Sequence, residues 1–278
     1  MPRSWKLWQR LDSSSMIDIH HHLLFGLDDG SKDIETSIAM AEMAAADGIT
    51  HIVCTPHANF HYKFDPVMNL EKLAQLRARL DGKITLGLGC DFHLSYENID
   101  DALKNPTKYT INQKRYLLVE FADFAIPQQM TEVFYQFLLT GIQPIITHPE
   151  RNLTIQKNPQ RLDEWIERGC YVQVTASSLT GRFGRLSSHF AATLLEENKI
   201  HFLATDAHNL QSRPPRMKEA FDLVAKHYGH ERAERLCVAN PRAAFFGEDL
   251  PAQQAPDAEE TVGKRSIWNR LLNRSDRN

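Results

Sequence analysis

Histidine and acidic residues recur in short clusters along this sequence. Asp18-Ile19-His20-His21-His22 places two histidines on alternate residues, and Thr205-Asp206-Ala207-His208 repeats this spacing with an aspartate and a histidine. Residues two apart in an extended strand point to the same side, so each cluster can present two ligands together, while His21 points elsewhere. Such pairs form half of a common type of transition-metal site, although one pair alone is also compatible with a structural role.

Other candidate ligands are single residues that follow apolar segments. They are His57 in Thr55-Pro56-His57, Asp91, Glu120, and His148 in His148-Pro149-Glu150-Arg151. Each alone has an ordinary structural explanation, but buried ionisable side chains are costly unless they are paired or coordinated. Together with the two clusters, these residues predict a metal centre. The candidate ligands are His20, His22, His57, Asp91, Glu120, His148, Asp206 and His208.

The ligand types narrow the identity of the metal and the chemistry. Imidazole and carboxylate ligands without a thiolate suit Mn, Fe or Zn. The set contains more ligands than one ion needs, so we expect a cluster of two or three divalent ions, Mn²⁺ foremost, bridged by carboxylates such as Asp91 and Glu120. Closely spaced ions activate a hydroxide and hold a phosphate oxygen for in-line displacement at phosphorus. The chemistry indicated is hydrolysis of a phosphoester.

Seven short apolar runs precede most of the candidate ligands and predict buried parallel strands. The candidates follow the carboxyl ends of these runs, and a barrel brings all such ends to one mouth, whereas an open sheet spreads them along an edge. We therefore predict an α/β protein with a seven-stranded (β/α) barrel. The runs are Ile17–Ile19, His51–Thr55, Ile84–Gly89, Arg115–Phe121, Gln143–Thr147, Tyr171–Thr175 and His201–Thr205.

Helical patterns lie between the runs, and three of the four that we place stop at a glycine, as helices often do. They are Ser31–Asp47, Asn69–Leu80, Gln128–Thr140 and Pro159–Arg168.

Composition and charge exclude several other classes of protein. A net charge of -3 over 278 residues does not indicate a nucleic-acid binder, and no apolar run is long enough to span a membrane. The four cysteines (Cys54, Cys90, Cys170 and Cys237) are widely spaced, and we expect buried, reduced thiols in a cytoplasmic protein. None of them begins a C-x5-R phosphate loop, which excludes a cysteine-dependent tyrosine phosphatase.

Several motifs resemble those of a known family. They are Asp18 to His22, the Leu27-Asp28-Asp29-Gly30 that follows, Thr55-Pro56-His57, His148-Pro149-Glu150-Arg151, the segment from Thr175 to Gly181, and Asp206-Ala207-His208-Asn209. From about Met16 to Phe246 the chain is similar to the bacterial protein-tyrosine phosphatases of the polymerase-and-histidinol-phosphatase (PHP) superfamily that act in capsule and exopolysaccharide synthesis. The resemblance implies a distorted (β/α)7 TIM-like barrel and a phosphotyrosine protein as substrate, in particular a bacterial tyrosine kinase.

The resemblance also implies residue roles. The eight candidate ligands match the metal ligands of the family, except that Asp91 stands where the family usually has glutamate. Arg151 and Arg213 match its phosphate-binding arginines, which fits the planar fork that a guanidinium offers to phosphate oxygens.

Two alternatives and the chain ends stay open. A histidinol-phosphate phosphatase or another PHP phosphoesterase would share the metal site, and a non-catalytic domain could bind a phosphorylated protein. We divide the chain into an N-terminal extension (1–15), a phosphatase barrel (16–250) and a disordered tail with a short amphipathic segment (251–278). The sequence leaves the oligomeric state open.

Overall fold

A computed structural model describes residues 15–122 and 126–251 of the chain. Almost all of the predicted N-terminal extension and the predicted tail lie outside the described residues, so both assignments stay predictions. No helix in the described parts of the chain is long and apolar enough to cross a membrane.

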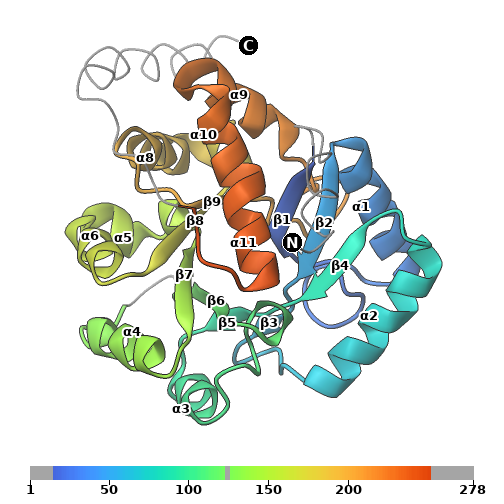
Figure 1. Cartoon of the computed structure of the whole chain (residues 1–278), viewed down its shortest axis with the longest axis horizontal. Helices are drawn as coiled ribbons and strands as arrows, with labels where there is room; N and C mark the ends of the chain where they lie inside the picture. Colours follow the sequence, from blue (N-terminus) through green and yellow to red (C-terminus); the bar gives the residue numbers. More distant parts are fainter. Residues whose placement is uncertain (1–14, 123–125, 252–278) are drawn as a thin grey trace, which may run out of the picture.

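The described strands form two parallel sheets at the centre of the molecule (Figure 1). One sheet has the order β1-β2-β4 and the other has the order β3-β5-β6-β7-β8-β9. The strands are β1 (Met16–His21), β2 (Ile49–Cys54), β3 (His57–Ala58), β4 (Thr85–Leu88), β5 (Asp91–His93), β6 (Tyr116–Glu120), β7 (Gln143–Thr147), β8 (Tyr171–Thr175) and β9 (Phe202–Ala204). All seven predicted runs are therefore confirmed as strands, whereas β3 and β5 were not predicted.

The two unpredicted strands mark places where the chain passes from one sheet to the other. Thr55 and Pro56 separate β2 from β3, and Gly89 and Cys90 separate β4 from β5. Backbone hydrogen bonds continue between the two neighbouring segments through both breaks. They run from Gly89 N to Cys54 O at 2.9 Å and from Asp91 N to Pro56 O at 3.3 Å. His57 and Asp91 therefore lie within short strands, beyond the strand ends at which the sequence placed them.

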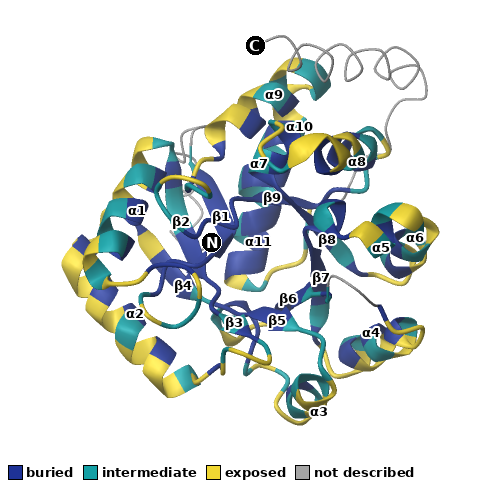
Figure 2. Cartoon of the chain, turned by 180° about the vertical axis from the view of Figure 1, so that it is seen from behind, coloured by how far each residue is buried: buried dark blue, intermediate teal, exposed yellow. Residues whose placement is uncertain are grey.

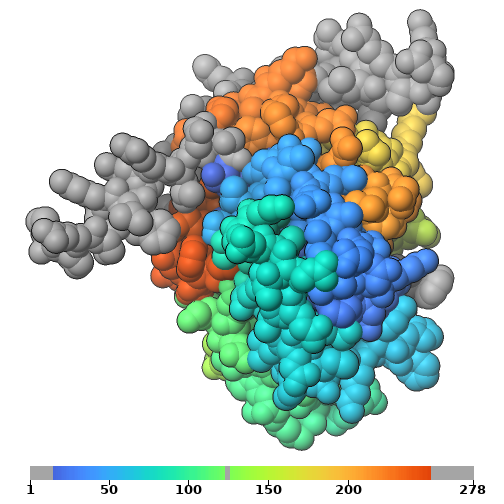
Figure 3. Space-filling model, turned by 90° about the vertical axis from the view of Figure 1, so that its right-hand side faces the viewer, coloured from blue at the N-terminus to red at the C-terminus, as the bar shows by residue number. Residues whose placement is uncertain are grey.

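Most helices lie around the sheets with one face exposed to solvent, whereas α11 lies at the centre and is mostly buried (Figure 2). The first three helices along the chain are α1 (Ile34–Ala46), α2 (Pro66–Leu80) and α3 (Tyr96–Lys104). The later ones are α4 (Met130–Leu139), α5 (Leu153–Lys157), α6 (Gln160–Glu167), α7 (Ala176–Leu179), α8 (Gly184–Glu196), α9 (Lys218–Tyr228), α10 (His230–Glu234) and α11 (Asn240–Phe246). Figure 3 shows the face that the first part of the chain, including α1 and α2, covers.

Capping residues account for where the first helices begin. Asp33 accepts a hydrogen bond from Thr36 N at the start of α1. Asp65 accepts hydrogen bonds from Val67 N and Met68 N, with Pro66 as the first residue of α2. A side-chain cap followed by proline is a typical helix start. The second helix therefore starts three residues before the predicted Asn69.

The apolar core supports the strands on both sides. One cluster packs the outer strand faces against the helices and includes Leu73, Phe134, Trp165 and Val224. A second cluster of β-branched and aromatic residues, among them Ile17, Ile19 and Phe202, lies together with Phe245 of α11. The four cysteines are buried, as predicted. The predicted α/β class with parallel strands is thus confirmed.

Candidate metal centre

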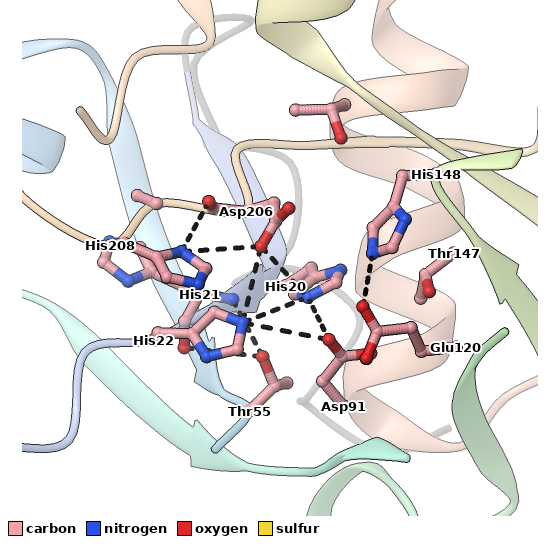
Figure 4. A network of polar contacts seen from close by, with 12 residues as sticks. His20, His21, His22, Thr55, Asp91, Glu120, Thr147, His148, Asp206 and His208 are labelled. Atoms are coloured by element: carbon pink, nitrogen blue, oxygen red, sulfur yellow. Dashed lines mark hydrogen bonds and ion pairs between the residues drawn. The ribbon is translucent and has the colours of Figure 1, made fainter. Parts of the chain in front are cut away.

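The eight predicted ligands converge on one site. Figure 4 labels all of them except His57. The structure brings them into four overlapping groups, in each of which the potential ligand atoms lie within 4.8 Å of one another. The groups are His20, His148 and Asp206; His20, His22 and Asp91; His57, Asp91 and Glu120; and His22, Asp29, His57 and His208.

His20, in β1, and His22, the residue after the end of β1, lie at the centre of the site. His20 Nε2 is 3.3 Å from Asp206 Oδ1 and 3.4 Å from Asp91 Oδ2. His22 Nε2 is 3.4 Å from the same Asp206 oxygen and 3.3 Å from His20 Nε2. Both rings are buried, and both point into the same cluster, as the alternation predicted. His21 is also buried, but its two ring nitrogens have no hydrogen-bond partner among the described residues, which fits a packing role.

Beyond Asp91, the site continues through His57, Glu120 and His148. His57 Nδ1 lies 3.3 Å from Asp91 Oδ2 and 3.6 Å from Glu120 Oε2. The other Glu120 oxygen lies 3.6 Å from His148 Nε2. Glu120 is thus shared between His57 of β3 and His148, which follows β7.

Two of the predicted ligands have a positive φ, a backbone conformation that residues other than glycine rarely adopt. His148 has φ 33° and Asp206 has φ 51°. Each such residue costs of the order of 1–3 kcal/mol and is retained where the surroundings require it, often at functional sites. His148 directly follows β7, and Asp206 lies two residues after the end of β9. At both positions the chain turns and the side chain lies in the cluster.

Two side chains that the sequence analysis did not single out fix the rings of the central histidines. Asp28 Oδ2 lies 2.8 Å from His22 Nδ1, and Gln173 Oε1 lies 2.9 Å from His20 Nδ1. These oxygens accept the Nδ1 protons, so the neutral tautomer of each ring leaves a lone pair on Nε2. Asp28 belongs to the Leu27–Gly30 motif of the resemblance, whereas Gln173 lies inside β8 and carried no signal.

Asp29 is a further carboxylate that the sequence analysis gave no role. Its Oδ1 lies 3.4 Å from His57 Nε2 and 3.5 Å from His208 Nε2. The side chain is about half exposed, at 52%, so it stands at the rim of the site while the other ligands lie deeper. Its proximity to both histidines lowers its pKa.

The two predicted phosphate-binding arginines also reach this site. Arg151 Nη1 and Arg213 Nη2 both contact Asp206 Oδ2, on the side of the carboxylate away from His20 and His22. Arg151 comes from the short 3-10 helix η3 (Pro149–Arg151), and Arg213 from the loop after β9. Both guanidinium carbons lie over the ring of Phe183, at 4.6 Å and 5.9 Å from its centroid.

The carboxylates raise the pKa of neighbouring histidines in the site, so they favour positive charge there. Burial lowers the pKa of His20, but Asp206 and Asp91 outweigh this effect and raise it to about 9. Burial also acts against protonation of His57, whose pKa is raised to about 11 by Asp29 and Asp91. Burial and the Asp91 charge raise the pKa of Glu120 to about 8.

The donor set fits divalent cations. Both oxygens of the buried Asp91 carboxylate have no hydrogen-bond partner among the described residues. The Nε2 atoms of His20 and His22 face each other with their Nδ1 atoms already hydrogen-bonded. Such an arrangement of lone pairs is unfavourable without a proton or a cation between them, because buried charges need partners. Imidazole and carboxylate donors are those that Mn, Fe and Zn accept.

Comparison with known protein families identifies the chain. The family model for capsular polysaccharide synthesis, CpsB/CapC, matches residues 16–245. The chain therefore belongs to the CpsB/CapC family, which confirms the resemblance seen in the motifs.

Individual relatives are similar over most of their length. Tyrosine-protein phosphatase YwqE of Bacillus subtilis is 38% identical over 220 residues, which are 78% of this chain and 86% of the relative. Tyrosine-protein phosphatase CpsB of Streptococcus pneumoniae is 31% identical over 242 residues, covering 84% and 99%. Among solved structures, one described as the crystal structures of YwqE and CpsB, unique metal-dependent tyrosine phosphatases, matches with a TM-score of 0.81 and 36% identity. It covers 86% of this chain and 97% of the solved chain.

Proposed function

We propose that this protein is a metal-dependent phosphomonoester hydrolase that acts on protein phosphotyrosine. The observation that carries the proposal is the convergence of eight histidine and carboxylate ligands beside two arginines in one site. Relatives named as tyrosine-protein phosphatases, at 31–38% identity, support the same activity.

The eight ligands, together with Asp29, would hold two or three divalent ions, with Mn²⁺ as our first candidate and Fe or Zn as alternatives. Support comes from the four overlapping donor groups, which share His20, His22, His57 and Asp91. When bound, the ions would supply Lewis acidity and lower the pKa of a water nucleophile. Asp91, despite its shorter arm than glutamate, lies within 3.4 Å of both His20 and His57 and is therefore placed to bridge ions.

Arg151 and Arg213 would bind the phosphate group. In-line transfer spreads negative charge over the equatorial phosphate oxygens, and a guanidinium offers paired N–H donors in a fixed plane. Both side chains are partly exposed, at 23% and 25%, so a ligand can reach them. Arg213 Nε is buried and has no hydrogen-bond partner among the described residues.

We further propose that residues 16–250 form one distorted (β/α)7 barrel around this site. In such a barrel, β2 and β3 would count as one interrupted strand, broken at Thr55–Pro56. In the same way, β4 and β5 would count as one strand broken at Gly89–Cys90, which gives seven barrel strands. Between β9 and β1, support comes from the parallel bridge His21–Ala207 and from the hydrogen bond from Asp206 N to His20 O at 2.9 Å. Asp18 of β1 further supports the closure between β9 and β1, because its buried carboxylate accepts a hydrogen bond from Thr205 N at 3.0 Å.

The natural substrate that we propose is a phosphotyrosine on a bacterial tyrosine kinase of capsule or exopolysaccharide synthesis. The family description, capsular polysaccharide synthesis, supports this setting. A cytoplasmic location would give access to such a kinase, and four buried free cysteines are compatible with a reducing compartment.

Metal analysis and substrate profiling of the purified protein test this function. We expect bound divalent metal, loss of aryl phosphate hydrolysis on chelation, and best recovery with Mn²⁺. Phosphotyrosine peptide should turn over faster than phosphoserine peptide, histidinol phosphate or a nucleotide phosphodiester, because tyrosine, with a pKa of about 10, is the better leaving group. Activity that survives verified metal removal, or faster turnover of histidinol phosphate, would contradict the proposal.

Matched histidine variants separate the metal site from general effects of the substitution. His20→Ala should lose metal and activity together. His189→Ala removes an exposed histidine on α8 and should keep both. If wild-type protein binds phosphotyrosine peptide without metal and does not hydrolyse it with metal, the domain is a binding module and the enzymatic proposal fails.

A further inference from the structure

One aromatic ring contacts both arginines of the proposed phosphate site. Arg151 Cζ lies 4.6 Å and Arg213 Cζ lies 5.9 Å from the centroid of the Phe183 ring. Arg151 belongs to η3 and Arg213 to the loop after β9, so Phe183 contacts two separate segments of the chain. The face of an aromatic ring attracts cations within about 6 Å of its centroid, and this attraction increases when the cation is partly desolvated.

The turn that carries Phe183 has a well-defined conformation. Phe183 lies between α7 and α8, and Gly181 and Gly184 on either side have φ values of +88° and +83°. A Cβ atom at either glycine would meet nothing within 4 Å, so these positions need glycine for the backbone conformation and not for space.

Glu150 ties the start of this segment to the helix that carries Arg151. Its buried Oε1 accepts hydrogen bonds from Ser178 Oγ at 2.7 Å and from Thr175 N at 3.0 Å. Arg151 is the next residue in the chain after Glu150. The ring of Phe183 and the backbone of Arg151 therefore belong to one connected unit.

The arginines themselves need such support. Both guanidinium groups contact the same oxygen, Asp206 Oδ2, so two positive charges lie close together and repel each other. Long arginine side chains also lose rotamer entropy when they are held in one orientation. A ring face beneath both groups offsets part of the repulsion and restricts both side chains, while Arg213 Nε keeps no partner among the described residues.

We propose that Phe183 is a positioning residue that holds Arg151 and Arg213 in the orientation that binds the phosphate group. This inference rests on the proposed function and deepens it. Phe183 acts through the two guanidinium groups and does not itself contact the phosphate. A leucine at this position fills part of the same space but has no ring face, whereas a tyrosine keeps the face.

The test compares Phe183→Leu with Phe183→Tyr in the metal-loaded protein. Phe183→Leu should lower kcat/KM roughly 5- to 30-fold for aryl and alkyl phosphates alike, and weaken the binding of inorganic phosphate by a similar factor. Phe183→Tyr should stay close to wild type in both measurements. All variants should keep wild-type metal content. Phe190→Leu makes the same change on α8, where the side chain packs against the core, and should leave phosphate binding unchanged.

A double-mutant cycle distinguishes positioning from a structural role. In an Arg151→Ala background, Phe183→Leu should cost less than about 3-fold, because the closer of its two partners is already gone. Wild-type kinetics for Phe183→Leu, or an undiminished loss in the Arg151→Ala background, would overturn the inference. A loss confined to aryl substrates would also overturn it, because the ring would then contact the substrate.

Phosphate binding separates this inference from the proposed function. Titration calorimetry with inorganic phosphate requires no turnover. If the wild-type protein does not hydrolyse phosphotyrosine, the proposed function fails. The comparison of phosphate affinity between wild type and Phe183→Leu then still decides whether Phe183 positions the arginines.

Discussion

Replacement of Asp28 by asparagine should weaken metal binding without abolishing catalysis. The Asp28 side chain is buried, and its Oδ2 accepts hydrogen bonds from His22 Nδ1 at 2.8 Å and His57 N at 3.1 Å. Its Oδ1 accepts a third bond from Gly30 N at 3.0 Å. The charge of His22 lowers the pKa of Asp28 against the effect of burial, so the carboxylate is ionised when the bonds form.

The geometry sets the size of the effect. An asparagine offers one oxygen where Asp28 uses two, so its amide nitrogen must face either Gly30 N or the pair of donors on His22 and His57. In each orientation at least one buried donor loses its acceptor, which costs about 1–3 kcal/mol. Loss of a residue that orients a metal-binding histidine typically weakens metal affinity or activity about 10- to 100-fold. The two ranges agree, because each factor of ten corresponds to about 1.4 kcal/mol.

The assay is hydrolysis of an aryl phosphate at a series of buffered free Mn²⁺ concentrations. For Asp28→Asn we expect half-maximal activity at about 10- to 100-fold higher Mn²⁺, with most of kcat restored at saturation. Asp33→Asn is the matched control, because Asp33 caps α1 through Thr36 N and lies outside the cluster. An unchanged metal dependence in Asp28→Asn would refute the reasoning. So would a loss that excess metal cannot restore, because Asp28 would then act in the reaction itself.

Three further outcomes follow from the structure. Arg151→Ala should lower kcat/KM about 100- to 1000-fold while its metal content stays at wild type, with partial rescue by Arg151→Lys; kinetics and metal analysis of the same preparations check this. Burial and Arg235 lower the pKa of His201 to about 4, so His201 favours folding in its neutral form, and this contribution is lost as pH falls from about 6.5 towards 4. His201→Asn, which keeps an acceptor for Val172 N, should therefore lose less unfolding free energy than wild type over that pH range in denaturant titrations. A chain that ends at Pro251 should keep its metal content and kcat, because residues 15–251 contain every proposed ligand, and insolubility of this shortened chain would contradict that expectation.

The sequence could predict which residues gather in the proposed metal centre because their signal is local. Alternate residues at a strand end, such as His20 and His22, need only the geometry of one strand to point together. The single ligands His57 and His148 needed one more rule, that parallel strands deliver their carboxyl ends to the same edge or mouth. Both kinds of evidence are present in short windows of sequence, and the structure brings all eight residues together.

The residues that orient the ligands could not be predicted in this way. Gln173 and His20 are 153 residues apart, and a glutamine within a run of strand-forming residues carries no local sign that it meets a histidine. Phe183 has the same difficulty, because its partners lie on two other segments, η3 and the loop after β9. The breaks that create β3 and β5 were missed because strands of two and three residues are too short to show a periodic pattern. The early start of α2 is different, because the Asp65-Pro66 capping signal was present in the sequence.

Asp206 connects the two parts of the site. Its Oδ1 faces His20 and His22 at 3.3 Å and 3.4 Å, while its Oδ2 contacts Arg151 and Arg213. Asp206 lies two residues after the end of β9, with a positive φ of 51°, and one oxygen of its carboxylate faces each group. A phosphate bound by the arginines must therefore lie next to the proposed metal ions, since a single carboxyl group separates the two sets of ligands. This proximity would suit in-line transfer with metal ions bound, and it fits the convergence of the arginines with His20 and His22 on one side chain.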